Sequence, residues 1–147
     1  MAITAPLAGI SGLEVLVIGA GLGEECARLA GRNRVDAFEL PGELREFLAW
    51  RDLPGVEILD GDTLPKAVGK TYDLAVAIDV LEHIHPDEWA ETMDALAGAI
   101  RPGGALYCHN NFTGPGHPEH YDNTVLFAAW CAQYGFTQET EYVWRKR

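Results

Sequence analysis

Residues 13–24 read Leu-Glu-Val-Leu-Val-Ile-Gly-Ala-Gly-Leu-Gly-Glu, and the pattern of this stretch predicts the fold. The β-branched and aliphatic run over residues 15–18 is typical of a strand buried on both faces. Glycines alternate with other residues over positions 19–23, and a turn of this kind lets the backbone approach a ligand closely. A helix that begins near Glu24 would direct its N-terminal N–H groups at the same place. We therefore expect a ligand at the carboxyl end of this strand.

The spacing of the glycines bears on the identity of the ligand. A dinucleotide fingerprint, G-x-G-x-x-G/A, needs a small residue where this chain has Glu24, whose carboxylate would meet the phosphates. The spacing G-x-G-x-G followed by an acid resembles motif I of the class I S-adenosylmethionine-dependent methyltransferases, whose cofactor is a cationic sulfonium without phosphate. The resemblance implies that Gly19, Ala20, Gly21 and Gly23 contact this cofactor. A tight turn without a ligand, and a nicotinamide-dependent oxidoreductase that Glu24 disfavours, are the alternatives.

Composition limits the function classes. The 147 residues suit a single domain over 1–147, and 48% of them are hydrophobic. No apolar stretch approaches the roughly 20 residues of a membrane helix, and a basic leader is lacking, so we expect a cytoplasmic protein without a membrane partner. The net charge of −11 argues against nucleic acid as a partner. The three cysteines lack C-x-x-C spacing, which argues against a disulfide framework and a zinc ribbon.

An acid stands where a second strand should end. Residues 33–40 read as that strand, and Glu39 follows Gly19 by 20 residues. At this offset a carboxylate on the neighbouring strand can accept hydrogen bonds from both ribose hydroxyls of a nucleoside. We predict this role for Glu39, with Leu40 beside it as a further cofactor contact; an ordinary surface glutamate is the alternative.

Residues 56–59 are the third predicted strand, and an acidic turn follows them. This segment resembles the one in which the family holds the adenine amino group, and the match falls on Asp62, with Thr63 beside it. A carboxylate accepts hydrogen bonds and therefore suits an amine donor. Asp60 is a rival, and a simple turn cap is the alternative.

The most specific resemblance covers residues 72–85, which span the fourth strand at 71–79 and the run Val80-Leu81-Glu82-His83. In the methyltransferase family this strand end lines the methionine moiety and the site of methyl transfer. The resemblance therefore implies cofactor contacts from Asp79 and Val80 and catalytic roles for Asp79 and His83. A strand tip with hydrogen-bonded side chains and no ligand is the alternative.

All five histidines follow the fourth and fifth predicted strands, at positions 83, 85, 109, 117 and 120. A neutral imidazole can accept a proton at physiological pH, so each is a candidate general base, and His109 joins His83 and Asp79 in the predicted catalytic set. The histidines also suggest a zinc-like ion, but no pair has the H-x-x-x-H spacing of a helical site, and no metal ligand is assigned.

The remaining elements follow from hydrophobic spacing and from turn residues. Helices are expected over residues 24–30, 41–50, 87–100 and 122–134, with Phe47 and Trp50 in the core. Strands are expected over residues 105–108 and 137–144, one strand fewer than the family has. N-terminal covering helices have no counterpart either. The sheet edge left by the absent strand favours a homodimer, and residues 113–121 form the expected loop over the site.

These patterns together predict an α/β protein with a doubly wound, mostly parallel sheet of about six strands and helices on both faces, the Rossmann-like methyltransferase core. The resemblance implies methyl transfer from S-adenosyl-L-methionine to a small-molecule or protein acceptor. A non-catalytic protein that binds S-adenosylmethionine or another nucleoside is the main alternative.

Overall fold

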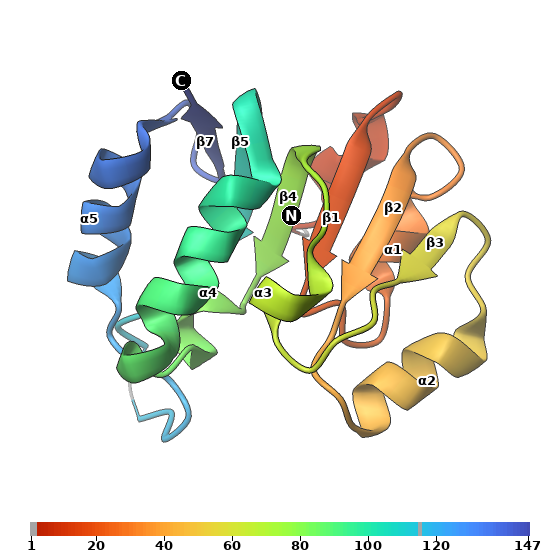
Figure 1. Cartoon of the computed structure of the whole chain (residues 1–147), viewed down its shortest axis with the longest axis horizontal. Coiled ribbons are helices and arrows are strands. Elements are labelled where there is room, and N and C mark those ends of the chain that lie inside the picture. Colours follow the sequence, from red (N-terminus) through yellow and green to blue (C-terminus); the bar gives the residue numbers. More distant parts are fainter. Residues whose placement is uncertain (1–2, 115) are drawn as a thin grey trace.

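Strand β1 (Glu14–Ile18) lies at the middle of the sheet in the computed structural model, which describes residues 3–114 and 116–147. It pairs in parallel with β2 (Arg34–Phe38) on one side and with β4 (Tyr72–Ile78) on the other (Figure 1). Residues 15–18 are all buried. A central strand flanked on both sides and covered on both faces has no solvated side, which explains its unbroken apolar run.

The sheet has seven strands in the order β3-β2-β1-β4-β5-β7-β6. Strand β3 (Val56–Ile58) pairs in parallel with β2, and β5 (Ile100–His109) pairs in parallel with β4. Strand β7 (Val143–Lys146) is antiparallel to β5 and to β6 (Phe136–Gln138). The carboxyl ends of β1 to β5 therefore meet at one edge of the sheet, which lies at the bottom in Figure 1.

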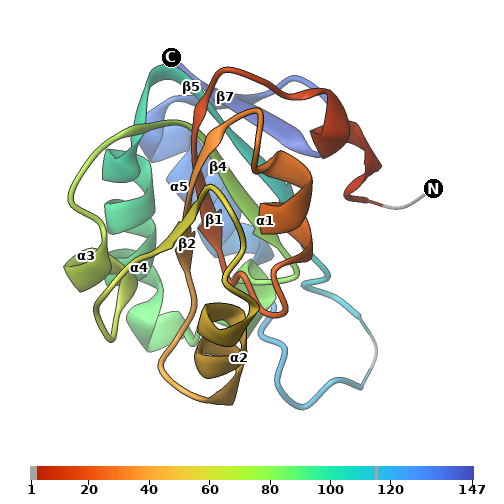
Figure 2. The same cartoon turned by 90° about the vertical axis from the view of Figure 1, so that its right-hand side faces the viewer.

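Helices cover both faces of the sheet (Figures 1 and 2). One face is covered by the elements η1 (Ala5–Gly9) and α1 (Glu24–Leu29), and Leu48 of α2 (Glu43–Arg51) belongs to the same core. The other face is covered by α3 (Leu64–Ala67), α4 (Pro86–Ala99) and α5 (Thr124–Tyr134). A short turn, η2 (Leu81–His83), follows β4. Over the described residues, no helix has both the length and the apolar character that crossing a bilayer requires.

The predicted doubly wound, mostly parallel α/β sheet is confirmed, but the strand count was wrong. Residues 137–144 do not form one strand, because the chain reverses within them to make the β6–β7 hairpin. The N–H groups of Glu139 and Thr140 both point to the carbonyl of Val143, at 2.8 and 3.4 Å. Strands of three and four residues are too short for a visible alternation of polar and apolar positions. The argument for a homodimer from an absent strand therefore fails.

The prediction that Phe47 and Trp50 lie in the core was also wrong. Phe47 is 41% and Trp50 77% exposed, and Leu48 is the buried residue of α2. Figure 1 shows the reason, because α2 lies beyond the carboxyl end of β2 instead of lying flat on the sheet. Arginines hold it there: Arg45 donates to the carbonyls of Leu59 and Gly61, the latter at 2.8 Å.

A buried polar pair ties β4 to β2. The hydroxyl of Tyr72 donates to the carboxylate of Asp36 at 2.7 Å, and the ammonium of Lys70 lies 3.1 Å from the same oxygen. Burial, and then the hydrogen bond to Asp36, raise the pKa of the Tyr72 phenol well above its usual value. The phenol therefore stays a donor throughout the physiological range, and the buried carboxylate keeps two partners.

Tyr72→Phe is expected to lower the free energy of unfolding by about 1–2 kcal/mol, since it removes one partner of a buried carboxylate. Tyr134→Phe is the matched control, because its hydroxyl donates to Asp94 at 2.6 Å in an exposed pair. Denaturant unfolding of both variants measures the difference. If both variants lose the same free energy of unfolding, the buried Tyr72–Asp36 pair stabilises the protein no more than the exposed pair does.

Candidate functional site

The loop between β1 and α1 is shaped by close packing against the end of β4. Gly19 has φ +62°, and a Cβ atom at this position would lie 2.5 Å from Cγ2 of Val80. Gly21 has φ +51°, but a Cβ there would meet only the Gly19 carbonyl oxygen, at 3.8 Å. Ala20 is buried, and its N–H donates to the carbonyl of Phe38 at 3.1 Å. The loop is therefore packed against β4 and β2 while the space next to Gly21 is open.

Glu39 lies at the end of β2 and connects that strand to the glycine loop. One carboxylate oxygen accepts the N–H of Gly21 at 2.7 Å, and the other accepts the N–H of Leu40 at 3.0 Å. Two large apolar side chains near this carboxylate, Leu22 and Leu40, are 55% and 59% exposed. The structure thus places polar acceptors and exposed apolar surface together where the sequence predicted a nucleoside.

The acidic turn after β3 is exposed. Asp62 forms an ion pair with Lys66 at 3.1 Å, and the hydrogen bond and charge of Lys66 lower the pKa of its carboxyl. Thr63 directly precedes α3, and its carbonyl accepts the N–H of Ala67 at 3.0 Å. Asp60 accepts the N–H of Gly61 at 3.2 Å. Both acids therefore keep accessible oxygens at this edge of the sheet.

Asp79 and His109 form a pair at the ends of β4 and β5. Asp79 Oδ1 lies 2.6 Å from His109 Nδ1, and the N–H of Asp79 donates to the carbonyl of His109 at 2.9 Å. Asp79 has a left-handed backbone with φ 54°. A carboxylate at Nδ1 favours the tautomer with its proton on that nitrogen, which leaves Nε2 as an acceptor. The pair thus has the arrangement of an oriented general base.

The sequence did not predict two further groups that interact with this pair, Tyr142 and Glu25. The Tyr142 ring lies across the His109 ring, with centroids 5.9 Å apart. Burial raises the pKa of Glu25, and the negative charges of Glu24 and Asp79 raise it further. Glu24, Glu25 and Asp79 are therefore close enough to interact electrostatically.

His83, the third predicted catalytic residue, packs elsewhere. Its ring is perpendicular to that of His120, with centroids 4.6 Å apart, and His120 stacks on His117 at 4.2 Å. His85 caps α4 by accepting the N–H of Asp87 at 3.1 Å. The structure therefore joins Asp79 to His109 and gives His83 different neighbours.

Glu82, for which the sequence predicted no role, holds the chain that follows β5. Its carboxylate accepts the N–H of Asn111 at 3.0 Å, and its backbone carbonyl accepts the N–H of Tyr121 at 2.7 Å. Glu82 therefore holds Asn111, two residues before the predicted covering loop at 113–121, and Tyr121, the last residue of that loop. Residue 115 of that loop lies outside the described residues.

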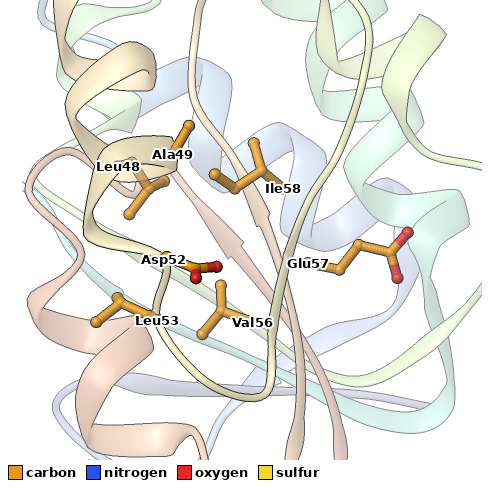
Figure 3. A pocket seen from close by; sticks show the side chains of 7 residues that line it. All are labelled: Leu48, Ala49, Asp52, Leu53, Val56, Glu57 and Ile58. Carbon is orange, nitrogen blue, oxygen red and sulfur yellow. The ribbon is translucent and has the colours of Figure 1, made fainter.

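No three His, Cys, Asp or Glu side chains are grouped as metal ligands within residues 3–114 and 116–147. A cavity of about 300 Å³ lies between α2 and β3 (Figure 3), and two of its lining residues, Leu48 and Leu53, pack against Gly23 of the glycine loop. A second one, of about 380 Å³, is lined by residues of α3, α4 and the chain before β4. Neither cavity includes the predicted catalytic residues.

The fold and the glycine loop together define a Rossmann-like domain of the methyltransferase type. The chain belongs to the methyltransferase domain family, whose sequence profile matches residues 3–140. This confirms the resemblance to class I methyltransferases. A search of curated proteins finds no match.

Solved structures share the fold at low sequence identity. The 1,6-didemethyltoxoflavin-N1-methyltransferase of Burkholderia thailandensis, with bound 1,6-didemethyltoxoflavin and S-adenosylhomocysteine, is 21% identical with a TM-score of 0.72; the match covers 99% of this chain and 78% of that one. The N-methyltransferase NodS of Bradyrhizobium japonicum, in complex with S-adenosylhomocysteine, is 17% identical with a TM-score of 0.75, covering 97% and 85%. The glycopeptide N-methyltransferase MtfA, complexed with sinefungin, is 19% identical with a TM-score of 0.60, covering 71% and 48%.

Gly19→Ala is expected to lower the free energy of unfolding by about 2–4 kcal/mol, because it combines left-handed strain with overpacking against Val80. Adding Val80→Ala removes the atoms that the new methyl group would meet. The double variant should therefore regain the free energy of unfolding that overpacking removes, while the cost of the left-handed backbone at position 19 remains. Denaturant unfolding of the two single variants and the double variant measures this coupling, and strict additivity would contradict the close approach.

Proposed function

We propose that this protein transfers a methyl group from S-adenosyl-L-methionine to an acceptor atom that gives up a proton, with Asp79 and His109 as the base. Membership in the methyltransferase family supports the reaction class. The pair's geometry, 2.6 Å between Oδ1 and Nδ1 at the sheet edge beside the glycine loop, is the observation that carries the proposal. Bound S-adenosylhomocysteine or sinefungin in structural neighbours supports the choice of cofactor.

The residues at the edge fit the adenosine part of this cofactor. Each oxygen of Glu39 accepts one backbone N–H and keeps lone pairs for ribose hydroxyls. Space beside Gly21 allows the close approach of a ligand, and the exposed Leu40 offers apolar surface to a ring. The proposed contacts are Gly19, Ala20, Gly21, Gly23, Glu39, Leu40, Asp62, Thr63, Asp79 and Val80.

The cofactor supplies an electrophilic methyl carbon on a sulfonium, so the work left to the chain is positioning and proton removal. Asp79 holds the ring of His109 through Nδ1, so that Nε2 is left to accept the proton of the acceptor. Such a base serves an acceptor with an ionisable proton, either a hydroxyl or an ammonium group, on a small molecule or a protein.

Glu39→Ala is expected to weaken binding of S-adenosylhomocysteine by about 1.5–3 kcal/mol, the range for hydrogen bonds to a charged group. Glu57→Ala on β3 is the matched control, because it removes an exposed carboxylate from a neighbouring strand. Isothermal titration calorimetry measures both. Binding of NAD without a response to S-adenosylhomocysteine would sink the cofactor assignment.

His109→Gln is expected to lower kcat by about 10²–10⁴-fold, the usual contribution of a positioned base, while cofactor affinity stays unchanged. The acceptor for this assay comes from a labelled-methyl screen of amines, phenols and peptides. His83→Gln is the matched control and should leave kcat near that of the wild type. Equal losses in both variants would remove the special role of His109, and cofactor binding without transfer to any acceptor would favour a non-catalytic binding protein.

A further inference from the structure

The outer face of α2 carries a row of exposed apolar side chains. Leu44, Phe47 and Trp50, here called the α2 ridge, are 48%, 41% and 77% exposed. Their spacing of three residues places them along one side of the helix. The rings of Phe47 and Trp50 are in contact, with centroids 5.5 Å apart. Large exposed apolar surfaces on a soluble domain mark interaction sites more often than scattered single residues do.

Packing inside the domain does not explain the α2 ridge. Other residues of α2 face the domain: Leu48 and Ala49 line the cavity of about 300 Å³ together with Val56 and Ile58 (Figure 3). The helix therefore faces a hollow that Asp52 and Glu57 also line, while the rings of Phe47 and Trp50 stay exposed.

The charges on α2 restrict what can cover the ridge. Arg45 and Arg51 donate to backbone carbonyls, including that of Leu22 in the glycine loop, so their guanidinium groups are already engaged. Among the described residues, Glu43 and Glu46 form no ion pair. The accessible surface beside the ridge is therefore apolar and negative.

We propose that the α2 ridge docks a basic, amphipathic polypeptide segment. Apolar side chains of the segment would cover Leu44 and Phe47, lysine or arginine would pair with Glu43 and Glu46, and a cation can also lie over the Trp50 ring. A second copy of this chain would bring its own net charge of −11 against the same surface. Nucleic acids and anionic membranes are repelled for the same reason.

The position of α2 connects this surface to the rim of the proposed cofactor site. Strand β2 leads through Glu39 directly into α2, and Figure 1 shows α2 at the edge of the sheet where the strands end. A segment on the ridge would thus lie beside the exposed Leu40. Docking itself needs neither cofactor nor methyl transfer, so it stands apart from the proposed function.

The test uses a synthetic amphipathic helix of about 14 residues, or four turns, built from leucine and lysine. Two matched peptides accompany it, one with glutamate for every lysine and one with serine for every leucine. Calorimetry at low salt is expected to show binding of the leucine and lysine peptide alone. Acrylamide quenching should show protection of Trp50, which is 77% exposed, whereas Trp89 and Trp130 are buried and Trp144 is half-buried; Trp50→Ser should remove this protection.

Variants then locate the binding surface. Phe47→Ser with Trp50→Ser, and separately Glu43→Gln with Glu46→Gln, are each expected to weaken peptide binding by about tenfold or more. Val125→Ser is the matched control, because Val125 is 80% exposed on α5. Circular dichroism melting checks that every variant folds.

Three results would overturn the proposal. They are the absence of peptide binding, equal binding of either matched peptide, and affinity unchanged by the ridge variants. Sedimentation gives a fourth, because a concentration-dependent dimer that Trp50→Ser abolishes would assign the ridge to a second copy of the chain.

Discussion

The parallel pairing of β1 between β2 and β4 is the constraint on which the site depends. Because the three strands run in one direction, Gly19, Glu39 and Asp79 reach the same edge of the sheet although they are distant in the sequence. The approach of Gly19 to Val80 sets how closely the turn after β1 packs against the turn after β4. Glu39 then fixes the other side of the turn through the N–H of Gly21.

Asp79 shows how this edge of the sheet holds a side chain of the proposed catalytic pair in place. A left-handed backbone costs a residue such as aspartate of the order of 1–3 kcal/mol, so the surroundings must stabilise it. Here one partner residue supplies both contacts, since His109 accepts the N–H of Asp79 and also faces its carboxylate. The backbone bond brings the ends of β4 and β5 together, and the side-chain contact orients the imidazole. The contacts that stabilise the left-handed backbone of Asp79 therefore also orient the imidazole of His109.

Short sequence patterns predicted the central strands of the sheet and the turns that follow them. The apolar run before Gly19 and the acid at the end of β2 were sufficient to predict the core of the sheet. They also predicted the edge at which the glycine loop and Glu39 lie. They failed for α2, whose orientation depends on bonds from Arg45 and Arg51 to carbonyls 14 to 29 residues away. Helical spacing alone does not say which side of such a helix faces the protein.

The contrast between local patterns and long-range contacts also applies to the candidate histidine bases. Asp79 was selected from the family resemblance and His109 because it follows the fifth strand, and their pairing came from strand adjacency across 30 residues. His83 was selected for its motif, but its ring found partners on the segment before α5. Sequence spacing therefore located the edge of the sheet, whereas only the packing of β4 against β5 showed which histidine the carboxylate orients.

The first turn of α1 shows how one pair of residues serves folding and ligand choice together. Glu24 and Glu25 lie at the positive end of the helix dipole, where carboxylates stabilise a helix of only six residues. In dinucleotide-binding folds that same helix end receives a pyrophosphate. Two carboxylates there neutralise the field that a phosphate would use and repel its charge. The residues that stabilise α1 therefore also disfavour phosphate ligands and favour a cationic one, which agrees with the methyltransferase family and with the negative surroundings of Asp79.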